Sequence, residues 1–188
     1  MIGCRSLKDH EVTALLALLK TRRDQVLFIL GVKTGFRVSE LLTLKVSDVY
    51  ANNTITTELC IQKRNTKRKR EGRRVRLHPM AVEALSLLVT ELKHAPHMYL
   101  FQSQKGPFNS PLSRIQAWRI IKNAANSLGL QGKVATHSWR KTFAQKVYRA
   151  LGENLFKTQA ALGHASIDST VKYLDINREE IDLVTESI

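Results

Sequence analysis

The chain has few cysteines and no long apolar run among its 188 residues. Its two cysteines, Cys4 and Cys60, lie far apart in the sequence, which excludes a disulfide framework and is typical of a reducing compartment. No apolar stretch approaches the ~18 residues of a membrane-spanning helix, and the first residues lack the apolar segment of a secretory signal. We therefore expect a cytoplasmic protein that does not associate with membranes.

Acidic residues are scarce as well. Lys and Arg total 30 against 16 Asp and Glu, which gives a net charge of +14. Such an excess indicates a polyanionic partner, most simply nucleic acid, although a basic protein without such a partner is the alternative. His94 and His97 have no further ligands at a useful spacing, and the sequence has no acidic cluster of the metal-binding type. We expect neither a metal nor a cofactor.

Most of the chain has the 3.6-residue apolar period of helices, and internal repeats and linkers are absent. Residues 55–62 instead alternate between apolar and polar, which is typical of a half-buried strand, and a second short strand carries Val75 and Leu77. The sequence predicts one domain, mainly α with a small antiparallel β-sheet near residues 55–77, an α+β fold. Predicted helices cover residues 6–20, 22–33, 36–42, 79–94, 111–128, 177–187 and much of the stretch from 136 to 173.

The turn between the two predicted strands is strongly basic. Residues 63–76 hold nine basic residues and one acidic residue. Cations this dense repel one another unless a counterion is near, and a DNA backbone supplies such counterions. A solvated turn is the alternative interpretation. We expect phosphate contacts from Lys63, Arg64, Lys69, Arg70 and Arg73.

The last third of the chain carries residues that suit chemistry on a phosphate. His137 and Arg140 are three positions apart, so on a helix they share a face. Gly163 is predicted to end a short helix, and Ser166 to cap the following helix, which carries Tyr173. Short helices separated by tight turns can converge on one small volume. Each of these residues alone is more often a packing residue, so the prediction depends on the whole set.

Phosphoryl transfer needs cationic donors, because negative charge develops on the non-bridging oxygens in the transition state. The planar fork of arginine suits a phosphate better than the point charge of lysine. A tyrosine hydroxyl is a nucleophile once nearby cations favour the phenolate, and the leaving alkoxide needs a proton from a lysine or histidine. Together these residue types on a basic chain predict cleavage of a phosphodiester without a metal.

Three segments resemble the signatures of the phage integrase family, the tyrosine recombinases, in their catalytic domain. They are residues 34–44, with the sequence TGFRVSELLTL, residues 136–144, with THSWRKTFA, and Leu-Gly-His at 162–164 followed nine residues later by Tyr173. Their order, spacing and flanking residues agree with the family over nearly all 188 positions. Trp139 stands where many members have Leu or Phe, which we interpret as a change in packing.

The resemblance implies a role for each signature residue. Arg37 and Arg140 bind the scissile phosphate. Tyr173 attacks it and leaves a 3′-phosphotyrosyl bond and a 5′-hydroxyl. His137 assists proton transfer, and His164 donates a hydrogen bond to the phosphate.

Two supporting residues are also implied. Glu40 stabilises the arrangement of the catalytic residues without contacting the phosphate itself. A lysine in the β-hairpin turn protonates the leaving 5′-oxygen. Counted back from Val75, Lys67 fits this position best. The turn is longer and more basic than the commonest pattern of the family, so Lys63 and Lys69 remain candidates.

The family further implies double-stranded DNA as partner and a tetrameric synapse formed through residues 177–188. A bacterial or phage-encoded protein associated with the nucleoid is the expected setting. Most members also carry an N-terminal helical domain that closes around DNA. Residues 1–188 match the catalytic domain alone, so the chain is either a fragment or one of the short members.

Two alternatives come from other classes of protein. A type IB topoisomerase-like enzyme uses the same tyrosine chemistry but relaxes supercoils, and the spacing of His164 to Tyr173 and the small size favour a recombinase over it. A non-catalytic DNA- or RNA-binding module is the second alternative. It is disfavoured because all six catalytic positions are filled.

Overall fold

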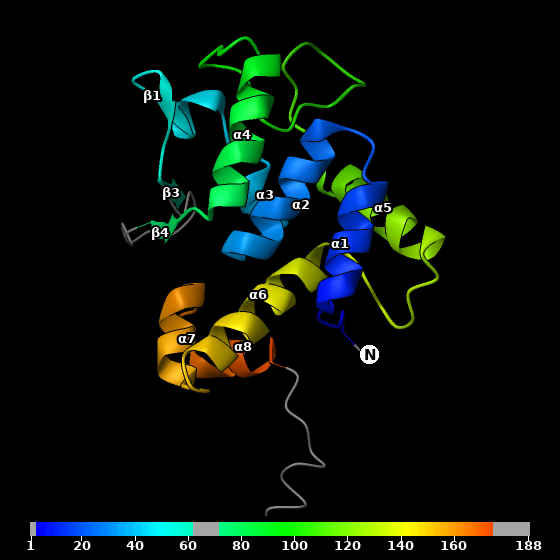
Figure 1. Ribbon diagram of the computed structural model, residues 1–188, viewed down its shortest axis with the longest axis vertical. Helices are drawn as coiled ribbons and strands as arrows, with labels where there is room; N and C mark the ends of the chain where they lie inside the picture. Colours follow the sequence, from blue (N-terminus) through cyan, green and yellow to red (C-terminus); the bar gives the residue numbers. More distant parts are fainter. Residues whose placement is uncertain (1–2, 62–71, 175–188) are drawn as a thin grey trace, which may run out of the picture. The chain divides into compact units, whose positions relative to one another are not determined.

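A computed structural model describes residues 3–61 and 72–174, and the chain divides after Phe143 into two compact units (Figure 1). The first unit holds α1 (Asp9–Leu18), α2 (Arg22–Thr34), α3 (Val38–Leu41), a 3₁₀ turn (Val46–Asp48), β1 (Tyr50–Ala51), β2 (Thr54–Ile55), β3 (Glu58–Ile61), β4 (Arg73–Arg76), α4 (Pro79–Glu91) and α5 (Arg114–Ser127). Helix α6 (Thr136–Ala150) begins in the first unit and ends in the second, which also holds α7 (Leu155–Leu162) and α8 (Ile167–Val171). The prediction of a mainly α protein with a small antiparallel β-sheet is confirmed, and the described residues form a second two-stranded sheet as well.

The ends of the helices are set by the capping residues that the sequence offers. The Thr21 side chain accepts a hydrogen bond from the Asp24 amide and begins α2, while Gly35 ends that helix with a φ of 62°. Pro79 begins α4 in the first turn, where its missing amide hydrogen costs nothing. Within the described residues, no helix is long and apolar enough to cross a membrane.

Helix α2 forms the centre of the first unit and packs against α1, α3 and α4 (Figure 1). Seven successive residues, 26–32, are buried, as expected of a helix covered on all sides. Gly31 faces the buried indole of Trp139, which a Cβ at Gly31 would overlap. The indole Nε1 donates a hydrogen bond to the Phe36 carbonyl over 3.2 Å. The tryptophan therefore packs at a place where the facing helix carries no side chain.

The β-structure differs in extent from the prediction. Strands β3 and β4 pair antiparallel from Glu58↔Arg76 to Ile61↔Arg73, with Leu59 and Ile61 buried as expected. The predicted strand over residues 55–62 is wrong in its first part, because Ile55 belongs to a separate two-stranded sheet, β1–β2. Asn52 and Asn53 connect these strands with φ of 51° and 59°, which asparagine tolerates in a tight hairpin turn.

The second unit packs α7 against α8. Gly163 ends α7 with a φ of 64°, and the Ser166 side chain caps α8 by accepting from the Ser169 amide. Tyr173 was expected on that helix but follows its end at Val171, and its amide donates to the Thr170 carbonyl three residues back. Such an i−3 bond is typical of a tightened final turn. The predicted helix at residues 177–187 lies outside the described residues.

The N-terminal segment is hydrogen-bonded to the middle of α6. Arg5 makes a two-pronged ion pair with Glu11, with N···O distances of 2.7 and 2.6 Å, and the Leu7 amide donates to the Thr142 hydroxyl over 2.8 Å. The hydrogen bonds from Arg5 lower the pKa of Glu11 from 4.5 to about 2, and this outweighs the effect of burial, which raises it. The ionised carboxylate therefore stabilises the fold.

This ion pair predicts an acid-sensitive contribution to stability. Because the folded pKa of Glu11 is below its unfolded value, the contribution is present above pH 4.5 and is lost as the pH falls towards 2. Glu11→Gln should lower the free energy of unfolding at pH 7 by about 1–2 kcal/mol, after allowance for solvent screening. The difference from the wild type should shrink between pH 4.5 and 2, as measured by urea unfolding. A difference that stays constant over that range would contradict the assignment.

Candidate active site

The C-terminal end of α2 gathers two arginines from distant parts of the chain. Arg73 donates from Nη2 to the Thr34 carbonyl over 2.5 Å, and Arg140 donates from Nη1 to the next carbonyl, that of Gly35. The following carbonyl, that of Phe36, accepts from the indole described above. Helix C-termini carry partial negative charge on their unpaired carbonyl groups, which favours cations there. Three successive carbonyl groups thus hold three side chains in place.

Arg37 follows this turn directly and is the N-cap residue of α3. A cation is not favoured at the start of a helix, and Glu40 resolves the conflict by binding Arg37 twice. Its carboxylate accepts from the Arg37 amide over 2.7 Å and from Nη1 over 3.1 Å. The Arg37 side chain remains 38% exposed, so it keeps surface with which to contact a ligand.

His137 and Arg140 both belong to α6, three positions apart, and differ in exposure. Arg140 is fully buried, whereas His137 reaches solvent. The pKa of His137 lies below its usual 6.5, first because the surrounding protein displaces water from the imidazole and then because Arg140 and Arg37 repel a further positive charge. His137 is therefore neutral at neutral pH and able to accept a proton.

Arg73 was expected to face DNA from the basic turn, but its side chain lies against the α2 terminus. Its guanidinium lies 4.6 Å from the centre of the Phe36 ring and 5.4 Å from that of Phe143. Burial, and then the charge of Arg140, lower the pKa of Arg73 to about 10, so it stays protonated at neutral pH. The other residues predicted in the turn lie outside the described residues: Lys63, Arg64, Lys67, Lys69 and Arg70.

These residues form one electrostatic group, here called the cationic cluster: Arg37, Arg73, His137 and Arg140. After burial, the charges of Arg140 and Arg37 lower the pKa values of both Arg73 and His137, so these two charges lie close to both groups. Glu40 offsets part of their charge. A group of guanidiniums with excess positive charge is suited to bind an anion, and its forked donors match a phosphate.

The second unit pairs His164 with Tyr173. Their ring centres lie 5.2 Å apart, with the planes inclined by 42°. The His164 Nδ1 lies 3.0 Å from the hydroxyl of buried Thr170, and this contact fixes the orientation of the imidazole. When the threonine hydroxyl donates to Nδ1, the proton of the neutral ring is on Nε2, which can then donate to a ligand.

The structure thus presents the predicted site residues as two groups, each within one unit. Arg37, Glu40, His137 and Arg140 lie together in the first unit, and His164 and Tyr173 form the pair in the second. Arg73 and Thr170 were not predicted as parts of these groups, because an arginine in a basic run and a threonine in a short helix have no distinguishing pattern. In the described residues, no group of three His, Cys, Asp or Glu side chains could hold a metal.

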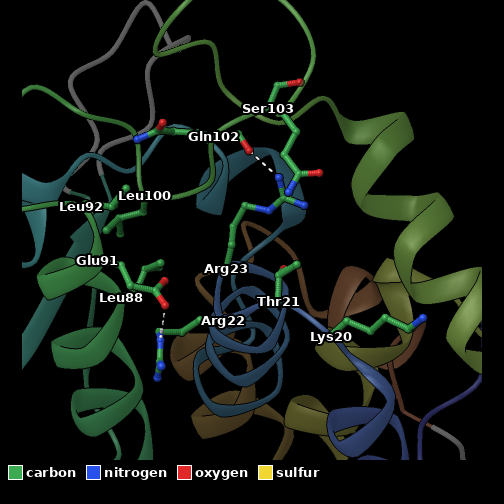
Figure 2. A pocket seen from close by; sticks show the side chains of 11 residues that line it. Lys20, Thr21, Arg22, Arg23, Leu88, Glu91, Leu92, Leu100, Gln102 and Ser103 are labelled. Carbon is green, nitrogen blue, oxygen red and sulfur yellow. Dashed lines mark hydrogen bonds and ion pairs between the residues drawn. The ribbon is translucent and has the colours of Figure 1, made fainter.

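A pocket occurs at the opposite end of α2, around its first turn (Figure 2). Arg22 and Arg23 line this pocket, and their side chains point in different directions. The charge of each is already matched, since Arg22 pairs with Glu91 over 2.8 Å and Arg23 with Asp24 over 2.7 Å. Helix α2 has 13 residues and is therefore about 20 Å long, so this pocket is remote from the cationic cluster.

Comparison with known proteins identifies the family of the chain. The model of the phage integrase family matches residues 5–180. This chain belongs to the phage integrase family. It is 32% identical over 177 residues to the probable integrase/recombinase YoeC of Bacillus subtilis (strain 168), covering 93% of this chain and 90% of that protein.

Two solved recombinase structures share the fold. The crystal structure of XerA recombinase has a TM-score of 0.76 and 26% sequence identity over 100% of this chain and 66% of that one. The post-cleavage complex of the XerH site-specific recombinase with palindromic difH substrate has a TM-score of 0.73 and 25% identity, over 96% of this chain and 51% of that one. The chain therefore spans between half and two thirds of the length of these structures.

The cationic cluster predicts how the protonation of His137 responds to an anion. A bound phosphate offsets the charges of Arg140 and Arg37, so inorganic phosphate should raise the pKa of His137 from its lowered position. Arg37→Ala removes one of the repelling charges and should raise it in the absence of phosphate. NMR titration of the imidazole resonances measures both effects, with the exposed His97 as control. A His137 pKa above 6.5 without phosphate would contradict the described electrostatics.

Proposed function

We propose that the chain is the catalytic domain of a site-specific recombinase that cleaves and rejoins double-stranded DNA through a 3′-phosphotyrosyl intermediate. The observation that carries the proposal is the pair of groups described above. One is a cationic cluster suited to a phosphate, and the other is a tyrosine beside an oriented histidine. Membership in the phage integrase family and the fold shared with XerH on its difH substrate support DNA as the substrate.

In this mechanism Arg37 and Arg140 bind the non-bridging oxygens of the scissile phosphate and stabilise the charge that develops there. Glu40 holds the Arg37 guanidinium in place. Arg140 has no exposed surface, so its contact with a phosphate requires the site to open when DNA binds. His164 donates to the same phosphate in an orientation set by Thr170.

The reaction itself is a displacement at phosphorus. The Tyr173 oxygen forms a bond to phosphorus, the bond from phosphorus to the 5′-oxygen breaks, and neutral His137 takes up the tyrosine proton. The departing 5′-oxygen receives a proton from a lysine of the basic turn. We assign this role to Lys67, with Lys63 and Lys69 as the alternatives. Attack by another 5′-hydroxyl on the phosphotyrosyl bond restores the DNA backbone and releases Tyr173.

The wider assembly is proposed from the sequence alone. Lys63, Arg64, Lys69 and Arg70 contact the DNA backbone, and residues 177–188 join protomers into a tetrameric synapse. All of these residues lie outside the described part of the chain. We place the protein in the cytoplasm at the nucleoid, where its substrate is found. Supercoil relaxation by a topoisomerase-like enzyme is not favoured, because the relatives are named recombinases.

The proposal predicts a clean separation of binding from cleavage. Tyr173→Phe keeps nearly the same volume and should bind DNA within about twofold of the wild type, yet form no covalent adduct. The matched control, Tyr148→Phe, changes a tyrosine on α6 and should form the adduct as the wild type does. The measurement is a denaturing gel of the protein with a nicked duplex carrying its site, followed by peptide mapping. An adduct that persists in Tyr173→Phe would refute the assigned nucleophile.

A further inference from the structure

Arg73 contacts two parts of the chain, and each of them carries another arginine of the cationic cluster. These two arginines are Arg37 and Arg140. One ring that it contacts, Phe36, directly precedes Arg37. The other, Phe143, follows Arg140 by three residues, one turn further along α6. Arg37 and Arg140 come from segments far apart in the sequence, and the Arg73 guanidinium contacts a ring next to each of them.

The hydrogen bonds reinforce this connection. Arg73 binds the Thr34 carbonyl and Arg140 binds that of Gly35, so two like charges are held on adjacent groups of one turn. Their repulsion contributes to the lowered pKa of Arg73, second only to burial. Each of the two cations is held by its own hydrogen bond, so a change in the position of one alters the repulsion on the other.

The neighbouring Arg74 shows that this placement is specific to one residue. Its side chain is 72% exposed and pairs with Glu58 over a long 3.4 Å contact. Both residues belong to β4 and follow the same basic turn, but successive residues of a strand point to opposite sides. Arg74 therefore provides a control of the same residue type in the adjacent position.

We propose that Arg73 is a positioning residue for phosphate binding, acting through Arg140, and this inference rests on the function proposed above. The role requires the shape of arginine as well as its charge. A planar guanidinium can stack between two rings while it donates in its own plane to Thr34. A lysine supplies one compact charge and cannot do both, so Arg73→Lys should leave Arg140 less well held.

The test compares Arg73→Lys with Arg74→Lys, so that charge is conserved in both variants. At saturating DNA, Arg73→Lys should form the covalent adduct about 10–100-fold more slowly than the wild type, by analogy with the loss of a preorganised donor. Half-site affinity should stay within about twofold, and the slope of log K against log salt should be unchanged for both variants. Arg74→Lys should react at the wild-type rate.

A neutral variant separates positioning from direct contact with the DNA backbone. Arg73→Met should slow cleavage without changing the salt slope, whereas loss of a backbone phosphate contact would reduce that slope by about 0.9. A reduced slope with an unchanged cleavage rate at saturation would overturn the inference.

A methylphosphonate at the scissile position separates positioning from a general effect on folding. The methyl group removes the oxygen charge that the arginines offset, so less depends on Arg140. The penalty of Arg73→Lys, relative to the wild type on the same linkage, should shrink by about fivefold or more. Damage to the fold would lower both rates by one factor. Equal penalties on the two linkages would therefore overturn the inference.

The role of Arg73 can also be tested without DNA cleavage, by measuring the binding of inorganic phosphate. The result then does not depend on the proposed function. Phosphate should raise the melting temperature of the wild type and of Arg74→Lys, and raise that of Arg73→Lys less, because a ligand that binds more weakly stabilises the folded state less. Equal rises in all three would overturn the role of Arg73 even if the wild type cleaves DNA. A wild type that binds phosphate in this Arg73-dependent way but forms no adduct would overturn the recombinase proposal alone.

Discussion

The carbonyl groups at the C-terminal end of α2 hold Arg73 and Arg140 of the cationic cluster in place. Guanidiniums taken out of water need compensating partners, and the partial negative charge of a helix C-terminus supplies them without an acidic residue. An acidic partner in the same place would compete with a phosphate for Arg140. A carbonyl group holds the arginine and leaves its full charge to act on a ligand. Gly35 makes the arrangement possible, because its left-handed φ of 62° turns the chain and a Cβ there would overlap Phe143.

Repulsion among the arginines of this arrangement lowers the stability of the fold, but it also favours the binding of an anion. Arg37, Arg73 and Arg140 repel one another, and Glu40 offsets only part of their charge. A phosphate that enters such a site relieves the repulsion, and the donors need little reorganisation when charge develops in the transition state. Burial, and then the charges of Arg140 and Arg37, lower the pKa of His137 and keep it neutral, so a proton acceptor remains available beside three permanent cations.

The sequence predicted the fold class and the signature residues because both have strong patterns. Helical periodicity extends over long segments and is therefore easy to recognise. His137 and Arg140 are three residues apart, a spacing that places both side chains on one face of a helix. Strands β1 and β2 were missed because two-residue strands are too short to show alternation. The inward position of Arg73 could not be predicted, since nothing in a run of basic residues marks the one that turns towards the core. Thr170 was missed because its contact with a histidine depends on the turn between α7 and α8.

We propose that a phosphate binds where α2 ends and α3 begins. The most direct measurement is a crystal structure of the protein trapped on a nicked duplex through its covalent bond. We expect a phosphorus bonded to the Tyr173 oxygen, with Arg37 and Arg140 within hydrogen-bond distance of its non-bridging oxygens. A phosphate held instead at the pocket beside Arg22 and Arg23, at the other end of α2, would contradict it.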